Sequence, residues 1–341
     1  MRYYDVFNGD ADGVCALQQL RLADPLDSTI VTGFKRDIAL LQSVSATDGD
    51  VVTVLDISLD RNRAALLALL DRGAVVHYFD HHFAGEVPAH PRLLAVIDES
   101  GALCTSALVD RYLGGRFRAW AVVGAFGDGM DDAAEALAQP LALDSVSFAQ
   151  LRELGINLNY AASGQSDADV LVRPADLVRI VSHYRDPLDL AREEPIIGRL
   201  GEARIADVER AFSRRAVHAS PSADVWLLPD EAWARRVIGT FADRLAFIEP
   251  HRAHAVITPR ADQAFVVSVR APRGGKLRAV DFCRAFATGG GTAAAAGIDR
   301  LPDEDLEGFV AAFDAAWGLC ARAEPTPPPP QTPQERTAAA A

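Results

Sequence analysis

Residues 3–13 read YYDVFNGDADG and decide how the N-terminal part of the chain folds. The aromatic and apolar residues of Tyr3–Asn8 predict a strand, and the amphipathic pattern of residues 12–22 predicts a helix directly after it. Gly9 and Gly13 permit a tight path between the two elements. Alternate side chains of an Asp-x-Asp turn can diverge toward two neighbouring ligands, so this turn is a candidate binding site at the carboxyl end of a strand.

The same alternation of strand and helix continues through the first hundred residues. Short β-branched runs predict four further strands, at residues 29–33, 51–57, 74–79 and 93–97. Amphipathic stretches between them predict helices at residues 36–43 and 61–72. A strand–helix–strand order of this kind predicts an α/β fold with a mostly parallel, doubly wound sheet covered by helices on both faces.

Changes in the pattern divide the chain into four parts. We predict a first domain at residues 1–160 and a helical connector at 161–215, where strand signals fade. The alternation then returns and predicts a second, smaller α/β domain at 216–320. Residues 321–341, with prolines at 327–330 and a run of alanines at the end, have little to bury and are predicted to be a disordered tail.

The charge balance bears on the class of partner. The 341 residues include 34 Lys and Arg against 47 Asp and Glu, a formal net charge of −13. A protein that grips long nucleic acid neutralises many phosphates with basic side chains, and this balance does not suit it. The composition favours a small or short phosphorylated substrate.

The chain carries no sign of export or of a membrane span. No apolar run approaches the roughly 20 residues that cross a bilayer, and the N-terminus lacks the pattern of a signal peptide. We therefore expect a cytoplasmic protein with no membrane partner. The four cysteines follow no zinc-ligand spacing and are expected to be small buried apolar residues: Cys15, Cys104, Cys283 and Cys320.

Acidic and imidazole side chains follow several of the predicted strands and one apolar run. They are Asp10 and Asp12 after the first strand, Asp56 after the third, Asp80, His81 and His82 after the fourth, and Asp128 after residues 121–126. Each cluster alone is compatible with an ordinary turn. Ligands of open α/β sheets bind outside the carboxyl ends of the strands, so we expect these clusters to meet in one site.

Carboxylates gathered in one crevice repel one another unless cations compensate their charge. Oxygen ligands with an imidazole nitrogen suit Mn²⁺ or Mg²⁺ better than they suit a thiolate-bound zinc ion. Two such ions about 3.5–4 Å apart can clamp the attacking and leaving oxygens of a phosphoryl displacement. The pattern thus predicts a metal site for phosphate chemistry.

Taken together, these four motifs resemble motifs one to four of the DHH superfamily of phosphoesterases, in order and in spacing. The glycine-rich residues 289–297 (GGGTAAAAG) resemble the signature of the DHHA1-type domain that usually accompanies them. The resemblance covers most of residues 1 to 320. It implies a hydrolase that acts on phosphoric ester bonds with two divalent ions, Mn²⁺ in preference to Mg²⁺.

The resemblance also implies a role for each matching residue. Asp10 and Asp56 would hold one ion, with Asn8 beside it, while Asp12, Asp56, His81 and Asp128 would hold the other, with Asp56 bridging. His82 would face the substrate and assist the leaving group, and Asp80 would orient the histidine behind it. In the second domain, Arg270 would grip a phosphate, and Gly289, Gly290, Gly291 and Thr292 would approach the substrate.

Three positions depart from the family pattern. Val6 stands where many members have a histidine ligand of the first ion. Asn8 stands where exonucleases of the RecJ type have an aspartate, which predicts weaker binding of that ion. Thr292 stands where a histidine usually follows the glycines, which puts the transfer of substrate specificity in doubt.

Several functions agree with these motifs. The leading hypothesis is a phosphoesterase of short oligonucleotides or nucleotide derivatives, as in the nano-RNase branch. A RecJ-like single-strand exonuclease and a hydrolase like the family II pyrophosphatases are alternatives, and so is a nucleotide-binding module that has lost catalysis. A homodimer is compatible with each of them.

For two further pairs of residues, the sequence allows two roles each. Lys35 and Arg36 follow the second strand, where they could reach a phosphate or begin a solvated helix. Thr105 and Ser106 could cap a helix or line the cleft.

Overall fold

A parallel sheet organises the N-terminal lobe. The structure, a computed structural model, describes residues 1–318. Five strands pair in the order β2-β1-β3-β4-β5, and every pair is parallel. They are β1 (Tyr3–Asn8), β2 (Thr29–Gly33), β3 (Val51–Leu55), β4 (Val75–Asp80) and β5 (Leu93–Ile97). The predicted α/β fold with a mostly parallel sheet is confirmed in this lobe.

Helices cover both faces of this sheet. One face carries α1 (Ala11–Ala23), α3 (Thr105–Tyr112) and α4 (Arg118–Gly127), and the other carries α2 (Leu59–Asp71) and the 3-10 helix η1 (Leu40–Ser43). Successive side chains of a strand point to opposite faces, so Phe7 of β1 packs in the core of α1 and α4. Tyr4 and Val6 pack on the other side, in the core of α2. The sheet is therefore doubly wound, as predicted.

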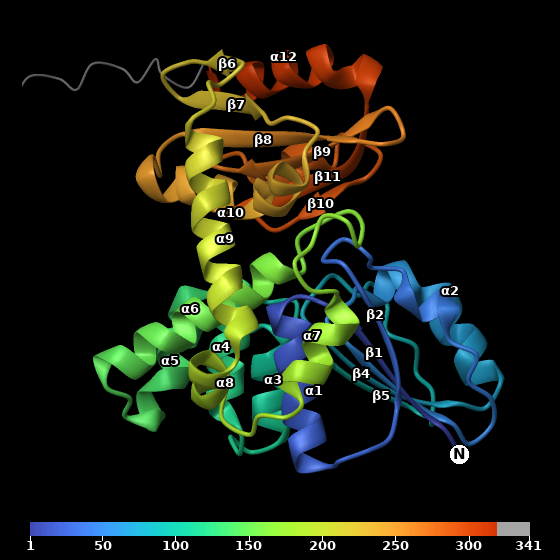
Figure 1. Cartoon of the computed structure of the whole chain (residues 1–341). Coiled ribbons are helices and arrows are strands. Elements are labelled where there is room, and N and C mark those ends of the chain that lie inside the picture. Colours follow the sequence, from blue (N-terminus) through green and yellow to red (C-terminus); the bar gives the residue numbers. More distant parts are fainter. Residues whose placement is uncertain (319–341) are drawn as a thin grey trace, which may run out of the picture.

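The remaining helices of this part of the chain belong to the core of α1 and α4. They are α5 (Asp131–Ala138), the 3-10 helix η2 (Gln139–Leu141), α6 (Ser145–Ala161), α7 (Pro174–Val181), α8 (Pro187–Glu193) and α9 (Pro195–Phe212). Leu158, Leu177, Leu190 and Leu200, one from each of α6 to α9, share that core. Helix α9 then rises from this lobe to the next (Figure 1).

A second sheet forms the C-terminal lobe. Its strands pair in the order β10-β11-β9-β8-β7-β6, antiparallel except for β7 and β8. They are β6 (His218–Ala219), β7 (Ala223–Leu227), β8 (Ala253–Arg260), β9 (Ala264–Arg270), β10 (Gly289–Gly291) and β11 (Ala295–Pro302). Helix α10 (Ala232–Ile248) packs on one face, and α11 (Ala279–Cys283), the 3-10 helix η3 (Asp303–Asp305) and α12 (Leu306–Trp317) follow on the other side. This lobe is the smaller α/β domain that the sequence predicts.

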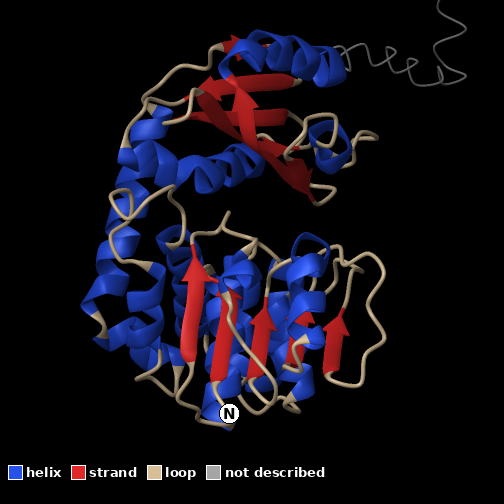
Figure 2. Cartoon of the chain, turned by 90° about the vertical axis from the view of Figure 1, so that its right-hand side faces the viewer, coloured by secondary structure: helices blue, strands red, loops and turns tan. Residues whose placement is uncertain are grey.

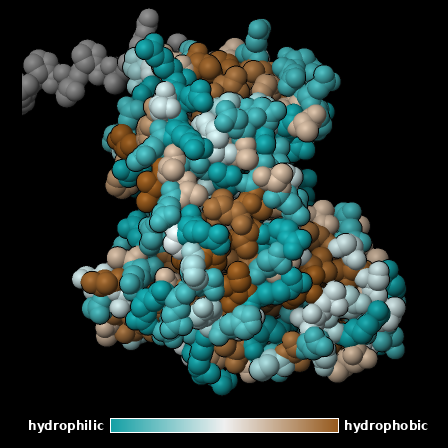
Figure 3. Space-filling model, viewed as in Figure 1, coloured by the Kyte–Doolittle hydropathy of each residue, from teal (hydrophilic) through white to brown (hydrophobic). Residues whose placement is uncertain are grey.

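Two ion pairs are among the contacts that join the lobes. Arg36 Nη1 lies 2.5 Å from Asp299 Oδ1 of β11. Arg235 Nε of α10 lies 2.8 Å from Asp169 Oδ1, in the loop after α6. The carboxyl ends of β1 to β5 point toward the second lobe (Figure 2), so residues that follow these strands face it. On the face shown in Figure 3, apolar side chains gather at the waist between the lobes.

Some local expectations need correction. The predicted helix at residues 36–43 is only the 3-10 helix η1, because the side chain of Asp37 accepts from the backbone N–H of Phe34 and holds a turn there. The tail at 321–341 and Cys320 lie outside the described residues, whereas the other three cysteines are buried. Among residues 1–318, no helix combines the length and apolar character that crossing a membrane requires.

Contact between glycines fixes the end of α4 against α6. A Cβ atom on Gly155 of α6 would lie 2.3 Å from Val123 O and 2.9 Å from Gly127 N, both backbone atoms of α4. No real Cβ approaches backbone that closely, so an alanine here would push the helices apart. Asp128 follows Gly127 directly, and its position therefore depends on this contact.

We expect Gly155→Ala to lower the free energy of unfolding by about 2 kcal/mol, because overpacking outweighs the gain in helix propensity. The matched control is Gly198→Ala on the exposed side of α9, where no atom lies within 4 Å of the new Cβ. That change should raise stability by about 0.5–1 kcal/mol. Urea unfolding of both variants checks the prediction, and equal stability of Gly155→Ala and wild type would contradict it.

Candidate metal centre

The predicted acidic and imidazole residues meet at the carboxyl edge of the first sheet. Asp10 follows β1, Asp56 follows β3, His81 follows β4, and Asp128 follows α4. Asp10, Asp12 and Asp56 are buried, and Asp128 keeps 22% of its side-chain surface. The edge that holds them faces the second lobe (Figure 2).

Backbone N–H groups at two helix starts hold the first two aspartates. Asp10 is the N-cap of α1, where its Oδ1 accepts from the backbone of Asp12 (3.1 Å) and Gly13 (3.3 Å). Asp12 reaches the first turn of α3, where its two oxygens accept from the backbone of Thr105 (2.7 Å) and Ser106 (2.8 Å). Helix N-termini favour negative charge, so both carboxylates stay fixed and available as ligands.

Asp56 has an unusual backbone conformation. Its φ is +59°, in the left-handed region that Asp adopts more readily than most residues. Its Oδ1 accepts a hydrogen bond from Thr105 Oγ1 at 3.0 Å. Burial, followed by the charges of Asp12 and Asp10, raises the pKa of Asp56 well above its ordinary value. A side chain in this position therefore requires a nearby cation to stay ionised.

The imidazole of His81 lies between two of these carboxylates. Its Nε2 is 3.5 Å from Asp56 Oδ1 and 3.6 Å from Asp128 Oδ2. Two ligand atoms each about 2.1 Å from a shared ion lie about 3.0–3.4 Å apart at octahedral to tetrahedral angles. Burial lowers the pKa of His81, but the neighbouring carboxylates raise it to about 11. The distances between His81 and the two carboxylates, and the negative charge of those carboxylates, both suit a divalent cation.

Two overlapping groups of donors could hold an ion. One is Asp12, His81 and Asp128, and the other is Asp56, His81 and His82, with the ligand atoms of each group within 4.8 Å of one another. Both groups include His81. Carboxylate oxygens with imidazole nitrogen match the donors that Mn²⁺ and Mg²⁺ accept, so the residues present fit a divalent ion.

Asp80 contacts His82 and not His81. Its Oδ1 accepts from His82 Nδ1 at 2.7 Å, while its buried Oδ2 has no partner among the described residues. Burial lowers the pKa of His82, but the hydrogen bond to Asp80 raises it to about 9. The ring keeps 44% of its side-chain surface, so it can touch a substrate.

Lys35 reaches the carboxylates and does not begin a solvated helix. Its Nζ lies 2.8 Å from Asp10 Oδ2 and 2.8 Å from Asn159 Oδ1, and 3.9 Å from Asp128 Oδ1. Burial lowers the pKa of Lys35, but the charges of Asp10 and Asp128 raise it above its ordinary value. Asn159 was not among the predicted residues, since a lone Asn in a helix carries no motif.

The predicted substrate residues of the second lobe are engaged within that lobe. Arg270 Nε lies 2.6 Å from Asp243 Oδ1, and its Nη1 donates to Ser268 Oγ at 3.0 Å. A Cβ on Gly289 would lie 1.7 Å from Cys283 O, so close backbone packing in β10 explains this glycine. Thr292 Oγ1 accepts from Ala295 N at 3.2 Å and closes the turn between β10 and β11. Contact of these residues with a substrate stays a prediction.

Comparison with solved structures gives the same fold. RecJ from Thermus thermophilus, in complex with Mn²⁺, has a TM-score of 0.65 and 20% identity over 92% of this chain and 51% of its own. A second exonuclease RecJ bound to manganese gives 0.60 and 20%, over 92% and 89%. A pGpG-specific phosphodiesterase, PggH, from Vibrio cholerae gives 0.50 and 16%, over 92% and 100%.

The fold that the predicted resemblance implies is therefore confirmed. The chain spans about half the length of the Thermus thermophilus RecJ chain. No protein-family profile matches the sequence, and no curated protein does either.

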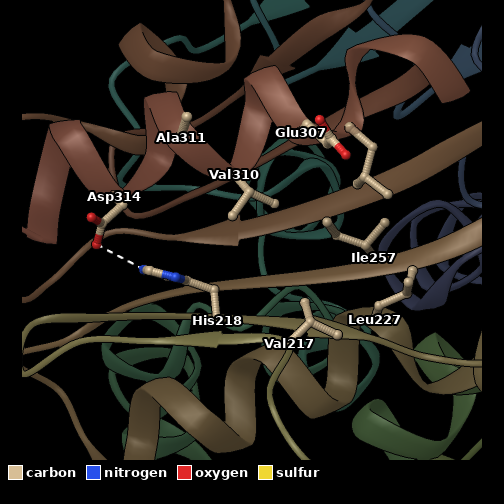
Figure 4. A pocket seen from close by; sticks show the side chains of 9 residues that line it. Val217, His218, Leu227, Ile257, Glu307, Val310, Ala311 and Asp314 are labelled. Carbon is tan, nitrogen blue, oxygen red and sulfur yellow. Dashed lines mark hydrogen bonds and ion pairs between the residues drawn. The ribbon is translucent and has the colours of Figure 1, made fainter.

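One apolar hollow lies far from this centre. It has a volume of about 450 Å³ and lies between α12 and the strands β6, β7 and β8 (Figure 4). Its lining includes Val310 and Ile257, and His218 Nε2 contacts Asp314 Oδ1 at 2.8 Å beside it. None of the predicted site residues lines it, so it stands apart from the chemistry of the first lobe.

The hydrogen bond from Thr105 to Asp56 gives a test of the centre. We expect Thr105→Val to weaken Mn²⁺ binding about 10-fold, because it removes the donor that orients Asp56 and leaves the backbone bond to Asp12 in place. The matched control is Ser106→Ala, whose hydroxyl lies against Cys104 Sγ and Ala121 O. Calorimetric titration with Mn²⁺ measures both, and an equal loss in the two variants would contradict the assignment.

Proposed function

We propose that this chain is a metal-dependent phosphoesterase that hydrolyses phosphate ester bonds at the carboxyl edge of its first sheet. The observation that carries the proposal is the meeting of Asp10, Asp12, Asp56, Asp128 and His81 at one edge facing the second lobe. A purely structural cluster of buried carboxylates would be costly without a cation. Enzymes of this fold, among them RecJ and the pGpG-specific phosphodiesterase, support the same class of reaction.

The chain's own residues suggest how the reaction would proceed. Asp12, Asp56, His81 and Asp128 would hold divalent metal, with Mn²⁺ as our choice of ion. When bound, such an ion polarises the phosphoryl group and lowers the pKa of a nearby water. His82, which Asp80 holds by Nδ1, can donate a proton to the leaving oxygen from its exposed edge. Asp56 keeps its place through Thr105, so the carboxylate is preorganised for the ion.

We propose a short oligonucleotide or a nucleotide derivative as the substrate, in the cytoplasm. The net charge of −13 does not suit a long nucleic acid. The chain covers the whole of the Vibrio cholerae phosphodiesterase chain, 89% of one RecJ chain and 51% of the Thermus thermophilus RecJ chain. A single-strand exonuclease is the second candidate, because the RecJ folds superpose with the higher TM-scores.

A panel of substrates separates these functions. It contains a dinucleotide, short RNA, single-stranded DNA, a 3′-phosphonucleotide and pyrophosphate, each with Mn²⁺ and with or without chelator. Release of mononucleotides from the shortest substrates supports the proposal, and processive digestion of long DNA supports the exonuclease. Tight nucleotide binding without turnover on any substrate would identify a binding module in its place.

We expect Asp56→Asn to abolish hydrolysis, by at least about 10³-fold, because the change removes the charge nearest His81. The matched control is Asp48→Asn, the same change at a carboxylate that is 80% exposed and paired with Arg92. The turnover number of each variant on the best substrate of the panel measures the effect. Retention of most activity in Asp56→Asn would show that the site is misassigned.

Arg270→Ala should raise KM about 10-fold and leave bound metal unchanged, because a phosphate would take the place of Asp243 at its guanidinium. The matched control is Arg300→Ala, an arginine of the same lobe that is 49% exposed and pairs with Asp262. Steady-state kinetics and metal analysis measure the two effects. A loss of bound metal in Arg270→Ala would contradict the assignment of Arg270 as a residue that binds the substrate phosphate.

A further inference from the structure

The surroundings of Asp10 differ from those of the other carboxylates. One of its oxygens accepts two backbone N–H groups at the start of α1, and the other contacts the ammonium of Lys35 at 2.8 Å. Asp10 belongs to neither of the two donor groups that the described residues offer to a metal. The place beside Asp10 that a cation would take is filled by a cation of the chain itself.

The two residues before Asp10 that could have supplied a ligand are engaged elsewhere. Val6 is fully buried and packs in the core on the opposite face of the sheet. Asn8 uses both ends of its amide on backbone, since Nδ2 donates to Lys35 O (3.1 Å) and Oδ1 accepts from Asp10 N (3.2 Å). A divalent ion at this position would therefore depend on Asp10 and a shared Asp56.

The chain holds Lys35 in place by contacts along its length. Its backbone N–H donates to Ala162 O at 3.1 Å, and its carbonyl accepts from Asn8. Its ammonium is fixed by Asp10 and by Asn159 Oδ1 of α6. Residues from two distant segments, 8–10 and 159–162, therefore converge on one lysine, as they would on a structural metal ion.

Lysine is rare in this chain, which makes the ammonium at this position unusual. The chain has only two lysines, Lys35 and Lys276, among its 34 basic residues. All the other basic residues are arginines. The guanidinium of arginine is planar and broad, whereas the ammonium of lysine is a compact point charge. A compact charge is the closest match a side chain offers to a metal ion.

We propose that the ammonium of Lys35 takes the place of one of the two divalent ions, so that the centre binds a single ion on the His81 side. This inference rests on the proposed metal-dependent function. Lys35 would neutralise Asp10 permanently and offer its remaining donor to a phosphate oxygen, and Asp12, Asp56, His81 and Asp128 would share the one exchangeable ion. Asn8 would then position Lys35 and would not act as a ligand.

The count of bound ions tests the inference without reliance on activity. Wild-type protein is dialysed against excess Mn²⁺, its metal content is measured by mass spectrometry, and its electron paramagnetic resonance spectrum is recorded. We expect about one ion per chain and the six-line spectrum of an isolated Mn²⁺. Two ions with a spin-coupled spectrum would overturn the inference and leave the proposed function standing. Absence of bound Mn²⁺ would overturn both.

A double variant tests whether Lys35 is the cause. Lys35→Ala combined with Asn8→Asp removes the ammonium and adds a carboxylate, so the variant should bind a second ion and show a coupled spectrum. The matched control is Lys276→Ala at the exposed second lysine, which should keep one ion. Circular dichroism and retention of the first ion confirm that the double variant folds. A folded double variant that still binds one ion would overturn the proposal.

Discussion

Repulsion among buried carboxylates is the constraint on which this structure depends. Asp10, Asp12, Asp56 and Asp128 lie within reach of one another at one edge of a sheet, where burial makes each charge costly. The fold reduces that cost by means of fixed partial charges. The first turns of α1 and α3 direct backbone N–H groups at two of the carboxylates, and only the remaining negative charge is left for side-chain cations and metal.

The doubly wound topology explains why these groups meet. Parallel strands end at the same edge, so turns that are far apart in the sequence deliver their side chains to one place. The same edge faces the second lobe, to which the Arg36–Asp299 and Arg235–Asp169 ion pairs connect the first lobe. Apolar packing of α9 against α10 joins the lobes as well, so their relative position depends on both apolar and polar contacts.

The parts of the structure that depend on local sequence patterns could be predicted from the sequence. The bounds of β2 and β5 agree with the predicted strands because β-branched runs with clear turn signals define them. The meeting of Asp10, Asp56, His81 and Asp128 was predicted because each follows a strand or an apolar helix. The contact between Lys35 and Asn159 could not be predicted, since 124 positions separate them and neither lies in a motif. The pairing of Asp80 with His82 likewise depends on side-chain orientation after β4.

The reason for the glycine run of the second lobe could not be predicted from the sequence either. The family resemblance implies a substrate contact here, and the structure shows that Gly289–Gly291 forms a strand that pairs with β11. Backbone packed against Cys283 leaves no space for a side chain at Gly289. Close packing and close approach of a substrate both select glycine, so sequence alone does not distinguish them.

Consecutive residues of one loop connect the centre with the second lobe. Lys35 points to Asp10, and Arg36 points the other way, to Asp299 of β11. Because the two residues are consecutive, one short stretch of backbone positions both the ammonium at Asp10 and one of the ion pairs between the lobes. The same loop therefore contributes a charge to the centre and a contact to the second lobe.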